Sequence, residues 1–165
     1  MSKSLEQEVE ELLTQGVKKK DIFRKLGKGD VKTKSKVLFY VNNMTTPEKK
    51  NMYQHLNFFI VILLAFVTAN KLIAIFVAFS MTGFMMTLLN LIVPAVNIHV
   101  MREVLRFRRL GYQFLVVISI LSLLQPENHA AREMTIFVIT ACGAAFLYLK
   151  IYPNKAILQK EIEKV

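Results

Sequence analysis

The stretch Leu72–Met101, LIAIFVAFSMTGFMMTLLNLIVPAVNIHVM, decides the fold of this chain, because thirty consecutive residues contain no Asp, Glu, Lys or Arg. A hydrocarbon core of about 30 Å is crossed by about 20 residues of α-helix, at about 1.5 Å per residue. Three shorter uncharged stretches flank it, at 51–70, 110–126 and 134–149. Four such stretches in 165 residues indicate an integral membrane protein.

The composition limits what else the chain can contain. It is 53% hydrophobic with a mean hydropathy of +0.37, and its length allows one membrane bundle with a small appended domain. The first 50 residues are polar and do not resemble a signal peptide, so we expect the first span to remain as an anchor. The single cysteine, Cys142, cannot form an intrachain disulfide and is expected to pack within the membrane.

The expected class is all-α, with four membrane helices between residues 47 and 152. The first is expected to begin after Thr46, because proline suits the first helical position and Glu48 favours the positive end of the helix dipole. We expect a tight turn at Asn70-Lys71 and a kink at Pro94. The four predicted spans are 47–70, 72–98, 110–125 and 127–152, with an inner loop at 99–109 and a C-terminal helix at 153–165.

The distribution of basic residues predicts the orientation. With four spans, 20 of the 22 Lys and Arg lie on the side of the two termini, and only Lys71 and Arg132 lie on the other side. Loops rich in Lys and Arg stay in the cytoplasm. We therefore expect both termini to be cytoplasmic, in what is expected to be a bacterial inner membrane, and the basic side to attract anionic lipid.

Residues 1–46 are expected to form a cytoplasmic head of three short helices. Ser4 and Gln7 fit a capping box before a helix that ends at Gly16. A second helix is expected at 18–26, ending at Gly27, and a third from Asp30 to Asn43. The amphipathic spacing of their Leu, Ile and Val residues predicts a small shared core.

Part of this head resembles a DNA-binding unit. The run Leu12-Leu13-Thr14-Gln15-Gly16, followed by Ile22 and by Leu26-Gly27, is similar to the helix-turn-helix of site-specific recombinases, and the similarity covers residues 9–42. Two features differ from that family: Phe23 replaces a small residue, and 28–31 lengthen the turn. The resemblance implies that the third helix enters the major groove of DNA. Its contact residues would be Lys32, Thr33, Lys34, Ser35 and Lys36.

The predicted inner loop is rich in arginine. If a helix continues past His99, the apolar Val100, Val104 and Phe107 share one face, and Arg102, Arg106 and Arg109 lie nearly opposite. Such a helix suits the headgroup boundary, where arginines bind lipid phosphates. Arg102, Arg106, Arg108 and Arg109 are therefore candidates for binding lipid or a partner, or else they only set the topology.

The expected spans carry no ionisable residue in their apolar cores, which argues against a proton-coupled transporter or a pump. Asn90 and Asn97 near Pro94 are candidates for lining a pore or for contacts between helices. The chain has no nucleotide-binding glycine loop and no H-E-x-x-H or G-x-S-x-G motif. The histidines lie on different segments, so we expect no metal site. Because these motifs are absent, we also expect no cofactor and no catalytic residue.

These patterns predict a non-enzymatic membrane anchor, sensor or complex subunit that acts through its basic cytoplasmic face. Its expected partners are anionic lipid headgroups and a protein partner or a second copy of the chain. Two alternatives remain open from the sequence. One is a membrane-tethered DNA-binding protein that uses residues 9–42, and the other is a small channel or oligomeric pore.

Overall fold

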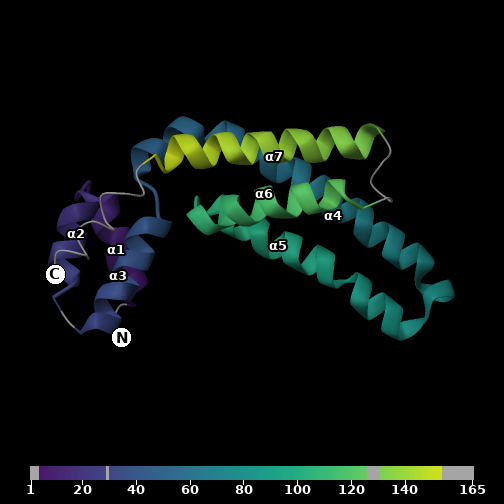
Figure 1. Ribbon diagram of the computed structural model, residues 1–165, viewed down its shortest axis with the longest axis horizontal. Coiled ribbons are helices and arrows are strands. Elements are labelled where there is room, and N and C mark those ends of the chain that lie inside the picture. The colour runs from purple at the N-terminus through teal and green to yellow at the C-terminus, as the bar shows by residue number, and fades with distance from the viewer. Residues whose placement is uncertain (1–3, 29, 126–130, 154–165) are drawn as a thin grey trace.

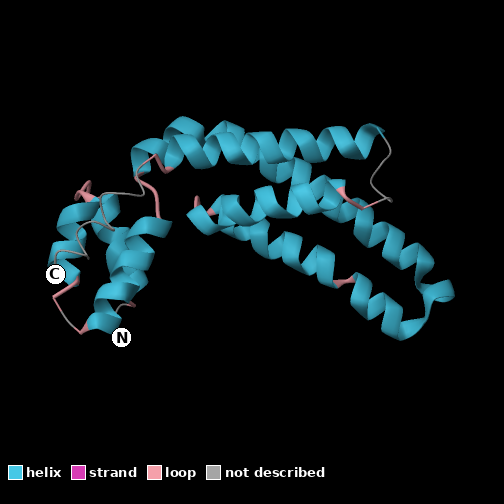
Figure 2. Ribbon diagram, in the orientation of Figure 1, coloured by secondary structure: helices cyan, strands magenta, loops and turns pink. Residues whose placement is uncertain are grey.

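The computed structural model describes residues 4–28, 30–125 and 131–153, and every regular element in these ranges is an α-helix. The all-α class predicted from the sequence is confirmed for these residues. Three short helices come first: α1 (Leu5–Thr14), α2 (Lys19–Leu26) and α3 (Val31–Asn43). Four helices follow: α4 (Pro47–Asn90), α5 (Ile92–Leu105), α6 (Arg109–Leu123) and α7 (Ala131–Ile151). The short helices gather at one end of the molecule, and the others extend away from them (Figures 1 and 2).

Helices α1, α2 and α3 pack around a core of their own. The capping box expected at Ser4 and Gln7 is present: each side chain bonds the backbone of the other residue. Gly16 has φ +78°, which lets the chain leave α1 and turn toward α2. The buried residues of this core are Val9, Leu13, Ile22, Val37, Val41 and Met44.

A second core lies where α4 to α7 meet. Helix α6 packs against α5 and α7, and α4 packs against the same two helices. The fully buried members of this core include Ile60, Val104, Tyr112, Leu115 and Leu147. Three helical segments are long and apolar enough to cross a membrane: Pro47–Phe79, Gly83–Leu105 and Ala131–Ile151. At 15 residues, α6 is apolar but shorter.

The prediction of a turn at Asn70-Lys71 is wrong. Helix α4 runs through both residues, and the chain reverses near Gly83 instead. Gly83 has φ +71° and ψ 165°, a backbone conformation that is open almost only to glycine. Asn70 and Lys71 both tolerate a helix interior, and the long stem of a lysine can carry its ammonium group toward the membrane surface. The spans expected at 47–70 and 72–98 are therefore the segments Pro47–Phe79 and Gly83–Leu105.

The expected inner loop at 99–109 is also too long. Helix α5 continues to Leu105 and α6 begins at Arg109, so only three residues connect them. The apolar face predicted for a helix past His99 is confirmed for Val100 and Val104, which are buried on α5. Phe107 is also buried, but it lies beyond the end of the helix and has a positive φ, so it does not belong to that helical face. The helix expected at 110–125 is Arg109–Leu123, and the one expected at 127–152 is described from Ala131 to Ile151. The C-terminal helix expected at 153–165 lies, beyond Pro153, outside the described residues.

Gly111 and Gly143 mark two close contacts between helices. A Cβ atom on Gly111 would lie 2.8 Å from the backbone of Glu103 and of Val104, so α5 and α6 approach each other backbone to backbone. A Cβ atom on Gly143 would lie 2.8 Å from Cδ1 of Ile60, which is the far end of a flexible side chain. The first contact is rigid, whereas the second can adjust.

We therefore expect Gly111→Ala to destabilise the protein by about 1–3 kcal/mol, because the two helices must separate. Gly143→Ala is the matched control and should change stability little, since Ile60 can rotate and alanine favours a helix. Thermal unfolding in detergent, followed by circular dichroism, measures both variants. Equal losses of stability in the two variants would contradict the close contact of α5 with α6.

Candidate functional site

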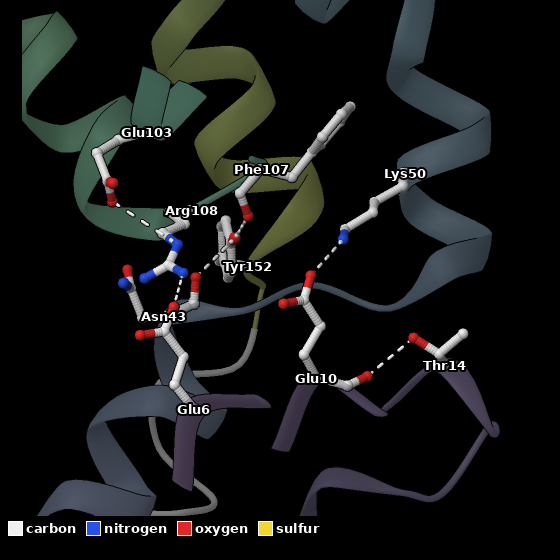
Figure 3. Close-up of polar contacts among 9 residues, drawn as sticks. All are labelled: Glu6, Glu10, Thr14, Asn43, Lys50, Glu103, Phe107, Arg108 and Tyr152. Atoms are coloured by element: carbon white, nitrogen blue, oxygen red, sulfur yellow. Dashed lines mark hydrogen bonds and ion pairs between the residues drawn. The ribbon is translucent and has the colours of Figure 1, made fainter. Parts of the chain in front are cut away.

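The N-terminal helices meet the ends of the longer helices at a polar site that we call the junction. It comprises Glu6 of α1, Asn43 of α3, Glu103 of α5, Arg108 between α5 and α6, and Tyr152 after α7. Figure 3 shows these side chains converging from the two parts of the molecule. Their polar contacts join residues that are about a hundred positions apart in the chain.

Tyr152 links three helix ends. Its hydroxyl lies within hydrogen-bond distance of the carbonyl oxygens of Asn43 and Phe107, the residues at the ends of α3 and α5 (Figure 3). Burial raises the pKa of Tyr152, against the opposing effect of Arg109 and Arg108. The hydroxyl therefore keeps its proton and acts as the donor to these carbonyls.

Phe107 ends α5 in an unusual way. The N–H of Phe107 bonds the carbonyl of Val104, and the N–H of Arg108 bonds the carbonyl of Glu103, which is the Schellman pattern. That motif usually has glycine at the position of Phe107, because φ is positive there, and here φ is +52°. The side chain of Phe107 is buried in the second core, which offsets the cost of this conformation, of about 1–2 kcal/mol.

Asn43 caps a helix to which it does not belong. Its Oδ1 accepts a hydrogen bond of 2.9 Å from the backbone N–H of Leu110, in the first turn of α6. The residue that precedes α6 is Arg108, whose side chain does not cap the helix. Asn43 is only 4% exposed and satisfies a donor that would otherwise be unpaired.

Arg108 connects α1 with the α5–α6 turn. Its guanidinium bonds Glu6 and lies 3.8 Å from a carboxylate oxygen of Glu103, and its side chain is 12% exposed. Burial alone would lower the pKa of Arg108, but the hydrogen bond and the carboxylates around it, first of all Glu6, raise it overall. Arg108 is thus a fixed cation held between two acids.

Two lysines satisfy carbonyl groups at the same end of the bundle. Lys19 donates to the carbonyl of Met44 and lies 5.6 Å from the ring centre of Tyr152. Burial, together with Lys49 and Arg109, lowers the pKa of Lys19 to about 8. Lys49 donates to the carbonyls of Lys150 and Ile151, at 3.2 and 2.7 Å, where the negative end of α7 favours a cation.

The four candidate arginines divide into two pairs. Arg102 and Arg106 are exposed. Arg108 belongs to the junction, and Arg109 donates to the hydroxyl of Tyr148 at 2.8 Å. Only the first pair is presented on the surface for an external partner.

The candidate DNA-contacting residues do not share one face. Lys32, Ser35 and Lys36 are exposed, whereas Thr33 and Lys34 are half-buried. Ser35 lines a groove between α3 and the start of α6. The exposed lysines of α3 therefore flank a surface that partly faces the start of α6.

The two candidate pore residues, Asn90 and Asn97, lie in different environments. Asn90 is exposed at the end of α4, whereas Asn97 is 3% exposed and its Oδ1 has no hydrogen-bond partner in the described structure. Asn57 lies within a buried network instead. Its Nδ2 donates to the carbonyl of Val104 at 3.1 Å, and its Oδ1 accepts from Tyr112 at 2.6 Å. Asn57 therefore ties α4 to both α5 and α6.

Among the described residues, no group of three His, Cys, Asp or Glu side chains could hold a metal ion. The junction consists of hydrogen-bonded and ion-paired groups that hold helix ends together. Sequence reasoning missed the roles of Glu6, Asn43, Glu103 and Tyr152, because no local spacing links them. The one sequence signal was the position of Asn43 and Tyr152 at helix ends.

Comparisons of this chain with protein-family models, with curated proteins and with solved structures found no match.

Arg108→Ala should destabilise the protein by about 2–4 kcal/mol, because it leaves Glu6 and Glu103 partly buried without their cation. Arg102→Ala is the control, since it removes an exposed arginine from the same turn region and should change stability by less than about 0.5 kcal/mol. Thermal unfolding in detergent compares the two variants. If Arg102→Ala lowered the stability as much as Arg108→Ala, the ion pairs of Arg108 with Glu6 and Glu103 would not be what stabilises the junction.

The pKa of Lys19 predicts a pH dependence. In the unfolded chain this lysine keeps its proton up to about pH 10.5, whereas in the folded protein it loses it near pH 8. Stability should therefore rise as the pH increases from 8 to 10.5, by at most about 3 kcal/mol. Lys19→Met should remove this rise. The unfolding temperatures of the wild type and of Lys19→Met are measured across that pH range. If Lys19→Met kept the full rise, the pH dependence would not come from Lys19.

Proposed function

We propose that this chain is a non-enzymatic integral membrane protein with four spans and both termini in the cytoplasm of a bacterial cell. In this proposal α1 to α3 form a cytoplasmic head that the junction holds against the ends of the spans. The basic face next to the head binds anionic lipid and presents the head as an anchor or complex subunit. The exposure of Arg102 and Arg106 is the observation that carries the proposal.

The course of the chain supports a fourth crossing by α6. Lys49, near the start of α4, bonds the end of α7, and Val104, near the end of α5, bonds Asn57 of α4. At its other end α7 lies against the middle of α4, where the guanidinium of Arg132 is 5.2 Å from the ring centre of Phe66. Helix α5 thus ends where α4 begins, and α7 begins beside the middle of α4, so α6 runs from the first of these levels to the second, which is the direction that a fourth span needs.

The distribution of charge supports the orientation. The described basic residues Lys49, Arg102, Arg106 and Lys150 lie at the end of the bundle where α4 begins, and Arg132 lies away from that end, beside the middle of α4. Loops and ends rich in Lys and Arg remain cytoplasmic. This end of the bundle also carries the head, since only three residues connect α3 to α4.

The two exposed arginines suit a lipid surface. They form no ion pair within the described ranges. Arg102 lies on the last turn of α5, on the face opposite the buried Val100 and Val104, and Arg106 directly follows the helix. An arginine near an anionic membrane surface contributes about 1 kcal/mol of binding free energy. This pair therefore gives the protein a preference for anionic over zwitterionic lipid.

The test measures the thermal stability of the delipidated full-length protein in detergent, with phosphatidylglycerol or phosphatidylcholine added. Phosphatidylglycerol should stabilise it more, and this preference should weaken with added salt. The double variant Arg102→Gln/Arg106→Gln should lower the apparent affinity for phosphatidylglycerol by about tenfold or more.

The double variant Lys32→Gln/Lys36→Gln is the matched control, because it removes the same charge from the exposed surface of α3. It should keep the preference for phosphatidylglycerol. Duplex DNA is added in a parallel series. If DNA stabilised the protein and only the α3 variant abolished that effect, the DNA-binding alternative would replace this proposal.

A further inference from the structure

A polar cavity of about 460 Å³ lies beside the junction. It is bounded by α1, by the connector of residues 44–46 between α3 and α4, and by the α5–α6 turn. Small-molecule sites have volumes of about 300–1,000 Å³. The side chains on which the inference rests are Glu10, Thr45, Lys50 and Arg106. Figure 3 shows Glu10 and Lys50 approaching each other near the connector. The α5–α6 turn, the start of α4 and α1 thus enclose one space.

Thr45 gives this cavity an unsatisfied polar group. The residue lines the cavity and is 4% exposed, and its Oγ1 has no hydrogen-bond partner in the described structure. A buried hydroxyl without a partner destabilises the protein. The hydroxyl is itself covered by protein, so the side chain must turn toward the cavity to donate a hydrogen bond to a ligand there, and that hydrogen bond would remove the destabilisation.

The cationic side of the cavity suits a phosphate group. Arg106 lines it and forms no ion pair in the part of the chain that the structure describes. Helix α4 begins at its wall, with Pro47, and the side chain of Thr46 does not cap that helix. The positive end of a helix favours an anion.

The acidic side of the cavity suits an amine. Glu10 is half-exposed, and its carboxylate is 3.7 Å from Lys50, which is a weak ion pair between two exposed groups. Glu6, by contrast, is already engaged by Arg108. Glu10 is therefore the carboxylate that can accept a hydrogen bond from an ammonium group in the cavity.

We propose that this cavity binds the headgroup of a phospholipid that carries both a phosphate and a primary amine, as phosphatidylethanolamine does. Arg106 and Thr45 bind the phosphate, and Glu10 accepts a hydrogen bond from the ammonium group. The cavity lies where α4 begins and α5 ends, which is the depth of the headgroups if both helices cross the bilayer. The proposal rests on the membrane placement in the proposed function, but it concerns a different lipid and shares only Arg106 with that function.

The test uses the delipidated full-length protein in detergent and compares three additions: phosphatidylethanolamine, phosphatidylcholine and soluble phosphoethanolamine. Phosphatidylcholine is the matched ligand, because its methylated amine cannot donate a hydrogen bond to Glu10. We expect phosphatidylethanolamine to raise the unfolding temperature more than either of the other two. Glu10→Gln should abolish that difference, because Glu10 binds the ammonium group. Thr45→Val should weaken the stabilisation by both lipids, because they share the phosphate.

Glu11→Gln is the matched control variant, because Glu11 is an exposed neighbour that does not line this cavity, and it should keep the difference. Equal stabilisation of the wild type by phosphatidylethanolamine and phosphatidylcholine would overturn the proposal. So would a preference for phosphatidylethanolamine that survives Glu10→Gln, or stabilisation by both lipids that Thr45→Val leaves unchanged. Equal stabilisation by soluble phosphoethanolamine would overturn the lipid assignment.

The response to phosphatidylglycerol distinguishes this proposal from the proposed function. Thr45→Val and Glu10→Gln leave Arg102 and Arg106 unchanged, so both variants should keep the preference for phosphatidylglycerol over phosphatidylcholine. If that preference is absent while Glu10→Gln still abolishes the preference for phosphatidylethanolamine, the proposed function fails and the cavity assignment stands.

Discussion

The arrangement of this molecule depends on the hydrogen bonding of helix ends. An α-helix leaves about four N–H groups unpaired at its start and four carbonyls unpaired at its end, and in or near lipid these groups cannot all bond water. Here the ends of α3, α5 and α7 and the start of α6 come together, and each uses a side chain from another helix. Asn43 accepts a hydrogen bond from the first turn of α6, and Lys49 donates to the last carbonyls of α7. The hydroxyl of Tyr152 donates to the carbonyls of Asn43, at the end of α3, and of Phe107, just after α5.

The same requirement explains a strained residue. A glycine at position 107 would relieve the backbone, but it would leave a hole in the core where the phenylalanine ring packs. The positive φ also places the carbonyl of Phe107 next to Tyr152. The second core therefore holds the α5–α6 turn in the conformation that the junction needs, and the junction in turn holds the N-terminal helices. The two cores are coupled through this short turn.

Much of the secondary structure could be predicted from the sequence, because it follows from local patterns. The capping box at Ser4, the break at Gly16 and the buried face of α5 all depend on residues within a few positions of each other. The reversal near Gly83 was missed because Asn70-Lys71 offered a polar interruption, while one glycine among apolar residues gave a weaker signal. The junction could not be predicted, because its contacts join segments about a hundred residues apart. For the same reason the sequence could not distinguish Arg108, which is paired internally, from the exposed Arg106.

The length of the first long helix explains the oblique course of α4 and α5 in Figure 1. Beside α7, α4 extends from Lys49 to Phe66, and it then continues past the start of α7 to Phe79. Its segment 56–79 has 24 residues, of which only Lys71 is charged, and is therefore about 36 Å long. A bilayer core of about 30 Å accommodates that length at a tilt of about 30–35°, within the range observed for membrane helices. If α4 crosses the bilayer with this tilt, Gly83 reverses the chain close to the far headgroups, and the exposed apolar side chains between Leu72 and Ile92 face lipid.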